Sequence, residues 1–182
     1  NAALKAGDIS QAKAYDETLI NHGTRLNYLR ENLVLEVNKI YLDLVEILEQ
    51  HNRRARLFSG IDIHLKSGFN DQLGLKESFI QSESADLKRK TTILGPHKAD
   101  IIFESKDLLI KDTFSRGEQK MLSILWSLSQ NIYLERFFKL SPILLLDDLS
   151  SELDAEMLDC FLPIIKYIEN RFIFSNIVDP FN

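Results

Sequence analysis

Two adjacent carboxylates, Asp147 and Asp148, directly follow the apolar run Ile143–Leu146. A short, wholly apolar run is typical of a strand buried on both faces, and ligands of open α/β sheets bind outside the carboxyl ends of such strands. There, one carboxylate can hold Mg²⁺ and the other can position or deprotonate an attacking water. Acids that only solubilise a loop give the same pattern, so neighbouring segments have to decide.

A second candidate is the segment Phe114–Lys120, which reads FSRGEQK and opens a predicted long helix. A serine followed by a glycine at a helix start leaves backbone N–H groups and a hydroxyl facing outward, which together form an anion site. Ser115 can equally be a simple helix N-cap.

Around these residues the sequence predicts a helix at 116–138, a strand at 143–146, a helix at 155–168 and a strand at 171–174. Alternating helices and fully apolar strands are typical of a parallel α/β sheet. We therefore expect the carboxylates and the serine to belong to one α/β unit.

A long helix is predicted from about Ser10 to Asn52, with Asp8 or Ser10 as its cap and a kink or division at Gly23. Its stripe is broader than the a/d seam of a coiled coil, which favours packing in a helical bundle. The apolar residues recur at steps of three and four, at Leu26, Leu29, Leu33, Val37, Ile40, Leu44 and Ile47.

The middle of the chain is predicted to be rich in strands. Alternation over 56–65 indicates one strand, Phe79–Ile80 and 91–94 are short candidates, and 99–104 with 108–111 indicate a hairpin that turns at 105–107. We expect three parts: a helical arm at 1–55, a β-rich connecting segment at 56–112, and an α/β segment at 113–182.

In this order and spacing, the segments resemble the ATP-binding-cassette (ABC) and SMC-like ATPases. Residues 114–119 look like the signature loop, 143–148 like the Walker B strand, and 151–154 like the D-loop. The spelling FSRGEQK, LLLDDLSSELD and LGPHKAD is similar to the RecF family of bacterial recombination mediators. The similarity extends over essentially the whole chain and is most specific in its last ninety or so residues.

The resemblance implies a fold and a set of site residues. The fold is the C-terminal part of an ABC-type P-loop ATPase head, a parallel sheet with flanking helices, joined to a helical arm of the lobe II type. Asp147 takes the Mg²⁺-associated position, and Asp148 the catalytic position where most ABC ATPases have Glu. Nucleotide contacts across a dimer fall to Ser115, Arg116, Gly117, Glu118, Ser151 and Asp154.

Two positions depart from that pattern or lack a role. The switch histidine of many relatives is absent, since the matching residues are Phe174-Ser175-Asn176, and the role passes to Ser175 or Asn176 or lapses. Gly95-Pro96-His97 has no predicted role beyond a rigid turn.

None of the 7 glycines is followed by Lys, so the Gly-Lys-Ser/Thr ending of a phosphate-binding loop is missing. We expect that loop in a region preceding Asn1, and we expect the chain alone to bind ATP poorly.

The full-length protein is then expected to be a weak DNA-dependent ATPase that uses ATP and Mg²⁺. It dimerises on ATP, clamps gapped or junction DNA in the bacterial cytoplasm, and acts with RecR and RecO to load RecA during DNA repair and the SOS response. The alternatives are another SMC-like ATPase, with a longer coiled coil or an added nuclease domain, and a non-catalytic interaction module derived from one.

Composition neither supports nor excludes DNA binding. The formal net charge is -5, so any DNA contact needs a local basic patch, such as Arg53, Arg54 and Arg56 or Lys88, Arg89 and Lys90. Solvation alone also explains such clusters. Cys160 is the single cysteine, stands among apolar residues and is expected to be buried and inert. The apolar runs are too short to span a membrane, and no signal-peptide pattern opens the chain, so no membrane partner is expected.

Overall fold

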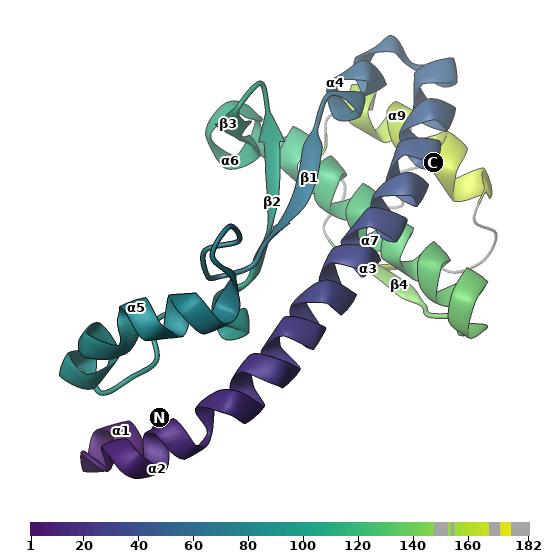
Figure 1. The fold of residues 1–182 in the computed structure, drawn as a ribbon. Helices are drawn as coiled ribbons and strands as arrows, with labels where there is room; N and C mark the ends of the chain where they lie inside the picture. The colour runs from purple at the N-terminus through teal and green to yellow at the C-terminus, as the bar shows by residue number, and fades with distance from the viewer. Residues whose placement is uncertain (148–152, 154, 168–171, 176–182) are drawn as a thin grey trace. The chain divides into compact units, whose positions relative to one another are not determined.

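The computed structural model describes residues 1–147, 153, 155–167 and 172–175 (Figure 1). The chain divides into two compact units. The arm unit comprises Asn1–Val34 and His64–Ile102, and the head unit comprises Leu35–Ile63 and Phe103–Asn182. The three-part division expected from the sequence stays a prediction, because compactness does not test where the lobes of a longer protein begin.

The arm unit is mainly helical. It contains α1 (Ala2–Ala6), α2 (Ile9–Ala14), the first half of α3 (Asp16–His51), α5 (Gly74–Arg89) and the 3-10 helix η2 (Pro96–Lys98). The side chain of Asp8 accepts a hydrogen bond from the Gln11 N–H at 2.9 Å. Asp8 is thus a helix cap as predicted, but it caps the short α2 and not the long α3, which begins at Asp16. Ser10 lies inside α2 and is not a cap.

Gly23 does not kink or divide the long helix, since α3 continues through it and the division falls at Tyr15. The glycine instead permits a close contact. A Cβ at this position would lie 2.6 Å from Leu75 Cδ2 and 3.1 Å from Pro96 Cγ. A larger residue at position 23 would require the Leu75 side chain and the Pro96 ring to shift.

Two predicted strands in the middle of the chain are wrong. Phe79 and Ile80 belong to α5, and 91–94 forms neither helix nor strand. The carboxylate of Asp86, which is buried, accepts from the Ile93 N–H at 3.0 Å and from Ser82 Oγ at 3.2 Å. This side chain therefore satisfies a backbone donor that a strand would have given to a ladder.

The Gly95-Pro96-His97 segment is a tightly fixed turn. Gly95 has φ 134° and donates from its N–H to the carbonyl of Gly68 at 2.9 Å. Arg30 of α3 donates from Nη1 to the Pro96 carbonyl at 2.6 Å. The rigid turn expected from the sequence is thus held by a hydrogen bond to Gly68 on one side and by Arg30 of the long helix on the other.

The head unit contains the second half of α3, η1 (Arg53–Ala55), α4 (Arg56–Ser59), α6 (Ile110–Thr113), α7 (Arg116–Phe138) and α9 (Ala155–Tyr167). Strand β4 (Leu144–Asp147) pairs in parallel with β5 (Phe172–Ser175), in the register Leu144↔Phe172 to Asp147↔Ser175. The α7 bounds and the parallel pairing were both predicted from the sequence and are confirmed.

A second sheet has the strand order β1-β2-β3, from β1 (Asp62–Lys66), β2 (Asp100–Ser105) and β3 (Leu108–Leu109). The predicted hairpin is confirmed, with Ser105 opposite Leu108. Lys106 and Asp107 have φ of 52° and 63°, as a two-residue type I′ turn requires. Residues 56–59, expected as strand, form α4 instead, and α6 begins where the second hairpin strand was expected to continue.

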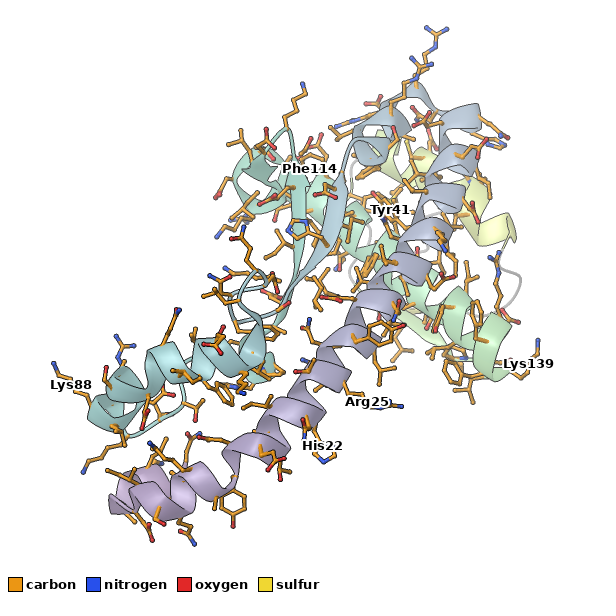
Figure 2. All side chains as sticks on the ribbon, in the orientation of Figure 1. His22, Arg25, Tyr41, Lys88, Phe114 and Lys139 are labelled. Atoms are coloured by element: carbon orange, nitrogen blue, oxygen red, sulfur yellow. The ribbon has the colours of Figure 1, made fainter. Side chains whose placement is uncertain are left out.

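The core of the head unit forms around α7. Trp126 of α7 meets Tyr41 and Phe103 in edge-to-face contacts, with ring centroids 6.4 and 5.5 Å apart. Tyr41 lies in the half of α3 that belongs to the head unit (Figure 2). Its hydroxyl donates to the Phe58 carbonyl at 2.8 Å, and burial raises the pKa of Tyr41 above its usual range. Cys160 is buried as predicted. The other side chains with almost no exposed surface include Leu44, Leu48, Met121, Leu125, Leu128, Met157, Phe161 and Ile164.

The apolar stripe of α3 is buried only in part. Val37, Tyr41, Leu44 and Leu48 are buried, whereas Leu26, Leu29 and Leu33 in the arm unit are 41%, 52% and 44% exposed. The predicted packing against other elements is therefore confirmed for the half of the helix in the head unit. Within the described residues, no helix is long and apolar enough to cross a membrane.

Gly68→Ala should destabilise the chain much more than Gly74→Ala. Both glycines have φ +78°, so both substitutions impose the same left-handed strain, of roughly 1–2 kcal/mol. A Cβ at Gly68 would also lie 2.5 Å from the Gly95 carbonyl oxygen, whereas nothing lies within 4 Å at Gly74. We expect a further loss of about 1–3 kcal/mol for Gly68→Ala in urea unfolding followed by circular dichroism. Equal losses for the two variants would contradict the tight turn.

Candidate nucleotide-binding site

Helix α7 begins with a complete capping box. Ser115 Oγ accepts from the Glu118 N–H at 3.3 Å, and Glu118 Oε2 accepts from the Ser115 N–H at 2.8 Å. The two hydrogen bonds join Ser115 to Glu118 and thereby fix the backbone between them, within the predicted signature loop. Ser115 and Arg116 are exposed, and Gly117 and Glu118 are half-buried.

This geometry leaves anion-binding capacity at the helix start. Arg116 and Gly117 belong to the first turn of α7, where backbone N–H groups have no intrahelical acceptor. The Ser115 hydroxyl accepts a hydrogen bond in the cap and still has a proton to donate. Together with the helix dipole, these donors suit a phosphate oxygen. The cap and the anion site are therefore compatible roles for the same serine.

The residues around the loop hold it from the protein side. Phe114 is buried and meets Phe58 edge-to-face, with ring centroids 6.2 Å apart. Gln119 Nε2 donates to the Phe114 carbonyl at 2.8 Å. The chain thus passes from a buried aromatic to an exposed serine in one residue.

Arg54 contacts two acidic residues from two different helices. Its Nη1 lies 2.6 Å from Glu156 Oε2 in α9, and its Nη2 lies 3.7 Å from Glu118 Oε1 in α7. Asn52 Oδ1 accepts from the Arg54 N–H at 2.9 Å and caps η1. The sequence placed Arg54 only in a candidate DNA-binding cluster, because no local pattern indicates partners so distant in the chain.

The Walker B side of the site is described only by its backbone. Asp147 is the last residue of β4, and the register places it beside Ser175, the last residue of β5. Both residues therefore lie at the carboxyl edge of the same parallel pair, where a ligand is expected. Asp148, Ser151, Asp154 and Asn176 lie outside the described residues, so their predicted roles stay predictions.

The two basic clusters belong to different units. Arg53 and Arg54 form η1 and Arg56 opens α4, in the head unit. Lys88 and Arg89 end α5, and Lys90 is its C-cap with φ 55°, in the arm unit. Cations near a helix C-terminus also interact favourably with its dipole, so this placement does not distinguish DNA contact from solvation.

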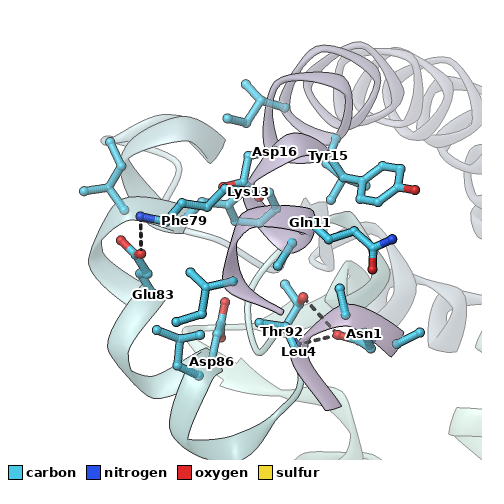
Figure 3. Close-up of a pocket in the computed structure, with 18 of the residues that line it drawn as sticks. Asn1, Leu4, Gln11, Lys13, Tyr15, Asp16, Phe79, Glu83, Asp86 and Thr92 are labelled. Atoms are coloured by element: carbon cyan, nitrogen blue, oxygen red, sulfur yellow. Dashed lines mark hydrogen bonds and ion pairs between the residues drawn. The ribbon is translucent and has the colours of Figure 1, made fainter. Parts of the chain in front are cut away.

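A pocket of about 710 Å³ lies in the arm unit, between the N-terminal helices and α5 (Figure 3). Lys13 Nζ lies 2.6 Å from Glu83 Oε1 at its wall, and Asn1 Oδ1 accepts from the Thr92 N–H at 2.8 Å. Burial, with a smaller contribution from the nearby Glu83 charge, raises the pKa of Asp16 there. None of Ser115, Arg116, Gly117 and Glu118 lines this pocket.

Ser115→Ala should destabilise the chain by about 1 kcal/mol, because the Glu118 N–H loses its acceptor at the helix start. Ser115→Asp should retain the stability, since Asp is as good an N-cap as Ser. Urea unfolding of the three proteins measures both effects. A loss for Ser115→Asp as large as for Ser115→Ala would show that the hydroxyl does more for stability than cap the helix.

Known proteins similar to this chain were found among curated sequences and among solved structures. No family model matches the chain. A "DNA replication and repair protein RecF" from Coxiella burnetii (strain Dugway 5J108-111) is 33% identical over 181 residues, which cover 99% of this chain and 48% of the relative. A protein of the same name from Hahella chejuensis is 31% identical over 159 residues, covering 85% and 42%. The chain spans about half the length of the curated relatives it matches.

The fold has a solved counterpart. A structure described as the recombination mediator protein RecF-ATP in the RecFOR pathway matches with a TM-score of 0.64 and 22% identity, covering 93% of this chain and 46% of that one. The fold is thus that of part of an ABC-type ATPase head with a helical arm. Over nearly its whole length this chain is therefore similar to one half of RecF proteins, in sequence and in fold.

Proposed function

We propose that this chain is the signature-bearing half of an ATP-dependent DNA-binding protein of recombinational repair. The observation that carries the proposal is the capped start of α7, which holds Ser115 exposed above a buried Phe114. Such a loop presents hydrogen-bond donors to a phosphate supplied by another surface. The names of the relatives, DNA replication and repair protein RecF, support repair as the setting.

The nucleotide in this proposal is held by a phosphate-binding loop in the rest of the full-length protein, and the signature loop of a second subunit closes over it. The Ser115 hydroxyl and the first-turn N–H groups of α7 contact the γ-phosphate. Their positions are set by the cap before ATP arrives, so little reorganisation is needed on closing. Closure therefore joins two heads only when the nucleotide carries a γ-phosphate.

The hydrolytic part of the proposal rests on the carboxyl edge of β4 and β5. Carboxylate oxygens are ligands that Mg²⁺ prefers, so Asp147 at this edge would hold that ion, and the ion would supply positive charge near the transferring phosphoryl group. Ser175, beside it in the register, takes the proposed switch position. Asp148 is the proposed general base that orients and deprotonates the attacking water. Its side chain is shorter than that of the usual Glu, which is consistent with slow hydrolysis.

In the full-length protein we propose that the ATP-bound dimer clamps gapped or junction DNA and that weak, DNA-dependent hydrolysis releases it. RecR and RecO are the proposed partners, and assistance to RecA loading is the proposed outcome. The setting is the bacterial cytoplasm. The similarity to RecF proteins, one of which is described in the RecFOR pathway, supports the proposal of these partners. The DNA contact of either basic cluster stays a prediction.

The proposal is tested by sedimentation velocity of the full-length protein with and without Mg-ATP. We expect ATP to convert monomer to dimer, and we expect Ser115→Asp to remain monomeric because its carboxylate repels the γ-phosphate. Ser115→Thr, which keeps a hydroxyl, is the matched control and should dimerise. If wild type stays monomeric with ATP, or if Ser115→Asp dimerises as well as wild type, the composite site is wrong.

Asp148→Asn should trap the ATP-bound dimer, because the variant binds nucleotide but cannot activate water. Its hydrolysis rate should fall by at least about a hundredfold, the usual contribution of a general base. Asp159→Asn, an exposed change in α9 outside the predicted site, is the control and should hydrolyse ATP at the wild-type rate. Unchanged turnover in Asp148→Asn would favour the alternative of a non-catalytic interaction module.

A further inference from the structure

The residues that follow the long helix in the chain pack against the signature loop. After α3 ends at His51, Asn52 caps η1, and the chain reaches Phe58 one turn later. Phe58 packs on Phe114, the residue before Ser115, and its carbonyl accepts from the buried Tyr41 hydroxyl of α3. The base of α3 and the signature loop therefore share one packed cluster within the head unit.

Glu118 uses its two carboxylate oxygens for two different tasks. Oε2 accepts from the Ser115 N–H at 2.8 Å and completes the cap, and Oε1 faces Arg54 Nη2 at 3.7 Å. The other side of the same guanidinium reaches Glu156 at 2.6 Å. Glu156 lies in the first turn of α9, the helix that follows the predicted D-loop. Arg54 thus connects the signature cap to the helix after the D-loop.

Stability alone gives a weak reason for this arrangement. The side chains of Arg54, Glu118 and Glu156 are 32%, 19% and 62% exposed. Ion pairs in such positions contribute little to folding stability, because water screens them and ordering the side chains costs entropy. A guanidinium can, however, hold two carboxylates in a defined geometry, which an ammonium does less well.

We propose that Arg54 is a positioning residue that couples the signature loop to α9, so that ATP-dependent pairing of two heads requires it. The inference rests on the proposed function, because it concerns the same composite site. When a second head's nucleotide meets Ser115, the cap and the start of α9 have to hold their relative places. Arg54 supplies that link through Glu118 on one side and Glu156 on the other.

A contact with a DNA phosphate is the competing role, since Arg54 stands between Arg53 and Arg56 in the sequence. Its guanidinium faces two carboxylates, which reduces the positive potential that it can offer to DNA. Arg53 and Arg56 are more exposed than Arg54 and are the better candidates for such a contact. Arg53→Ala is therefore a matched control from the same turn.

The test uses the full-length protein and the ATP concentration at which half of it sediments as dimer. Arg54→Ala should raise this concentration at least about fivefold, the lower range of coupling between two sites. Affinity of the monomer for a fluorescent ATP analogue and the melting temperature should stay unchanged, which a purely structural role does not predict. The three measurements are made without DNA, so Arg53→Ala should behave as wild type in all of them.

Charge exchange provides the rescue. Arg54→Glu should fail to dimerise at the wild-type ATP concentration. The double variant Arg54→Glu with Glu156→Arg should recover part of the dimer, because the pair with α9 is restored with opposite polarity while the new carboxylate at position 54 still repels Glu118. Arg54→Lys keeps the positive charge but not the planar guanidinium, so it should form only part of the wild-type amount of dimer. If Arg54→Ala lowers the melting temperature, Glu156→Gln removes one end of the link at an exposed position and should still raise the ATP requirement.

Three outcomes overturn the inference. Dimerisation of Arg54→Ala at the wild-type ATP concentration would do so and leave the proposed function intact. If Arg54→Ala dimerises normally but binds DNA more weakly, and the slope of its DNA affinity against salt concentration (both as logarithms) falls by about 1, Arg54 contacts a DNA phosphate instead. A wild-type protein that does not dimerise with ATP would remove the proposed function, and the coupling role with it.

Discussion

The start of helix α7 is the constraint on which the head unit depends. The capping box fixes the start of helix α7 at Ser115. The preceding residue, Phe114, therefore has an extended backbone, and its ring is buried in the core. If the helix began one turn earlier, Phe114 would leave Phe58 and the serine would no longer cap the free N–H groups. The same two hydrogen bonds therefore determine the packing of the core and the exposure of the donors that the proposed function uses.

The second half of the site follows from the parallel pairing of β4 and β5. The register that places Leu144 opposite Phe172 also ends both strands together, at Asp147 and Ser175. Strands of a parallel sheet are usually covered on both faces, yet Leu145 in β4 is 69% exposed, and Ile143, just before the strand, is 63% exposed. A two-stranded pair is too small to cover itself. This exposure agrees with a chain that spans about half the length of its relatives. The activity is therefore proposed for the full-length protein.

Prediction from sequence succeeded where neighbouring residues alone determine the structure, although the burial expected for the run 143–146 is wrong for Ile143 and Leu145. The cap at Ser115, the α7 helix, the apolar strands and the hairpin turn at Lys106 and Asp107 all have local signals. It failed for α5, because the face that α5 buries includes Ser78, Ser82 and Asp86, so hydrophobic periodicity does not reveal the helix. It failed at Gly23 because the glycine serves a contact with Leu75 and Pro96, which lie far away in the sequence.

The same distinction separates the two kinds of interaction at the signature loop. The capping box joins residues three positions apart, so the motif itself contains the information that shapes the loop. The contact between Arg54 and Glu156 spans 102 positions, and it exists only after α3, η1 and α9 have come together. A motif can thus suggest which group would meet a phosphate, but the residue proposed to position this group relative to α9 becomes visible only in the fold. This is why an arginine that first appeared to be one of three in a basic cluster is better understood through its two carboxylate partners.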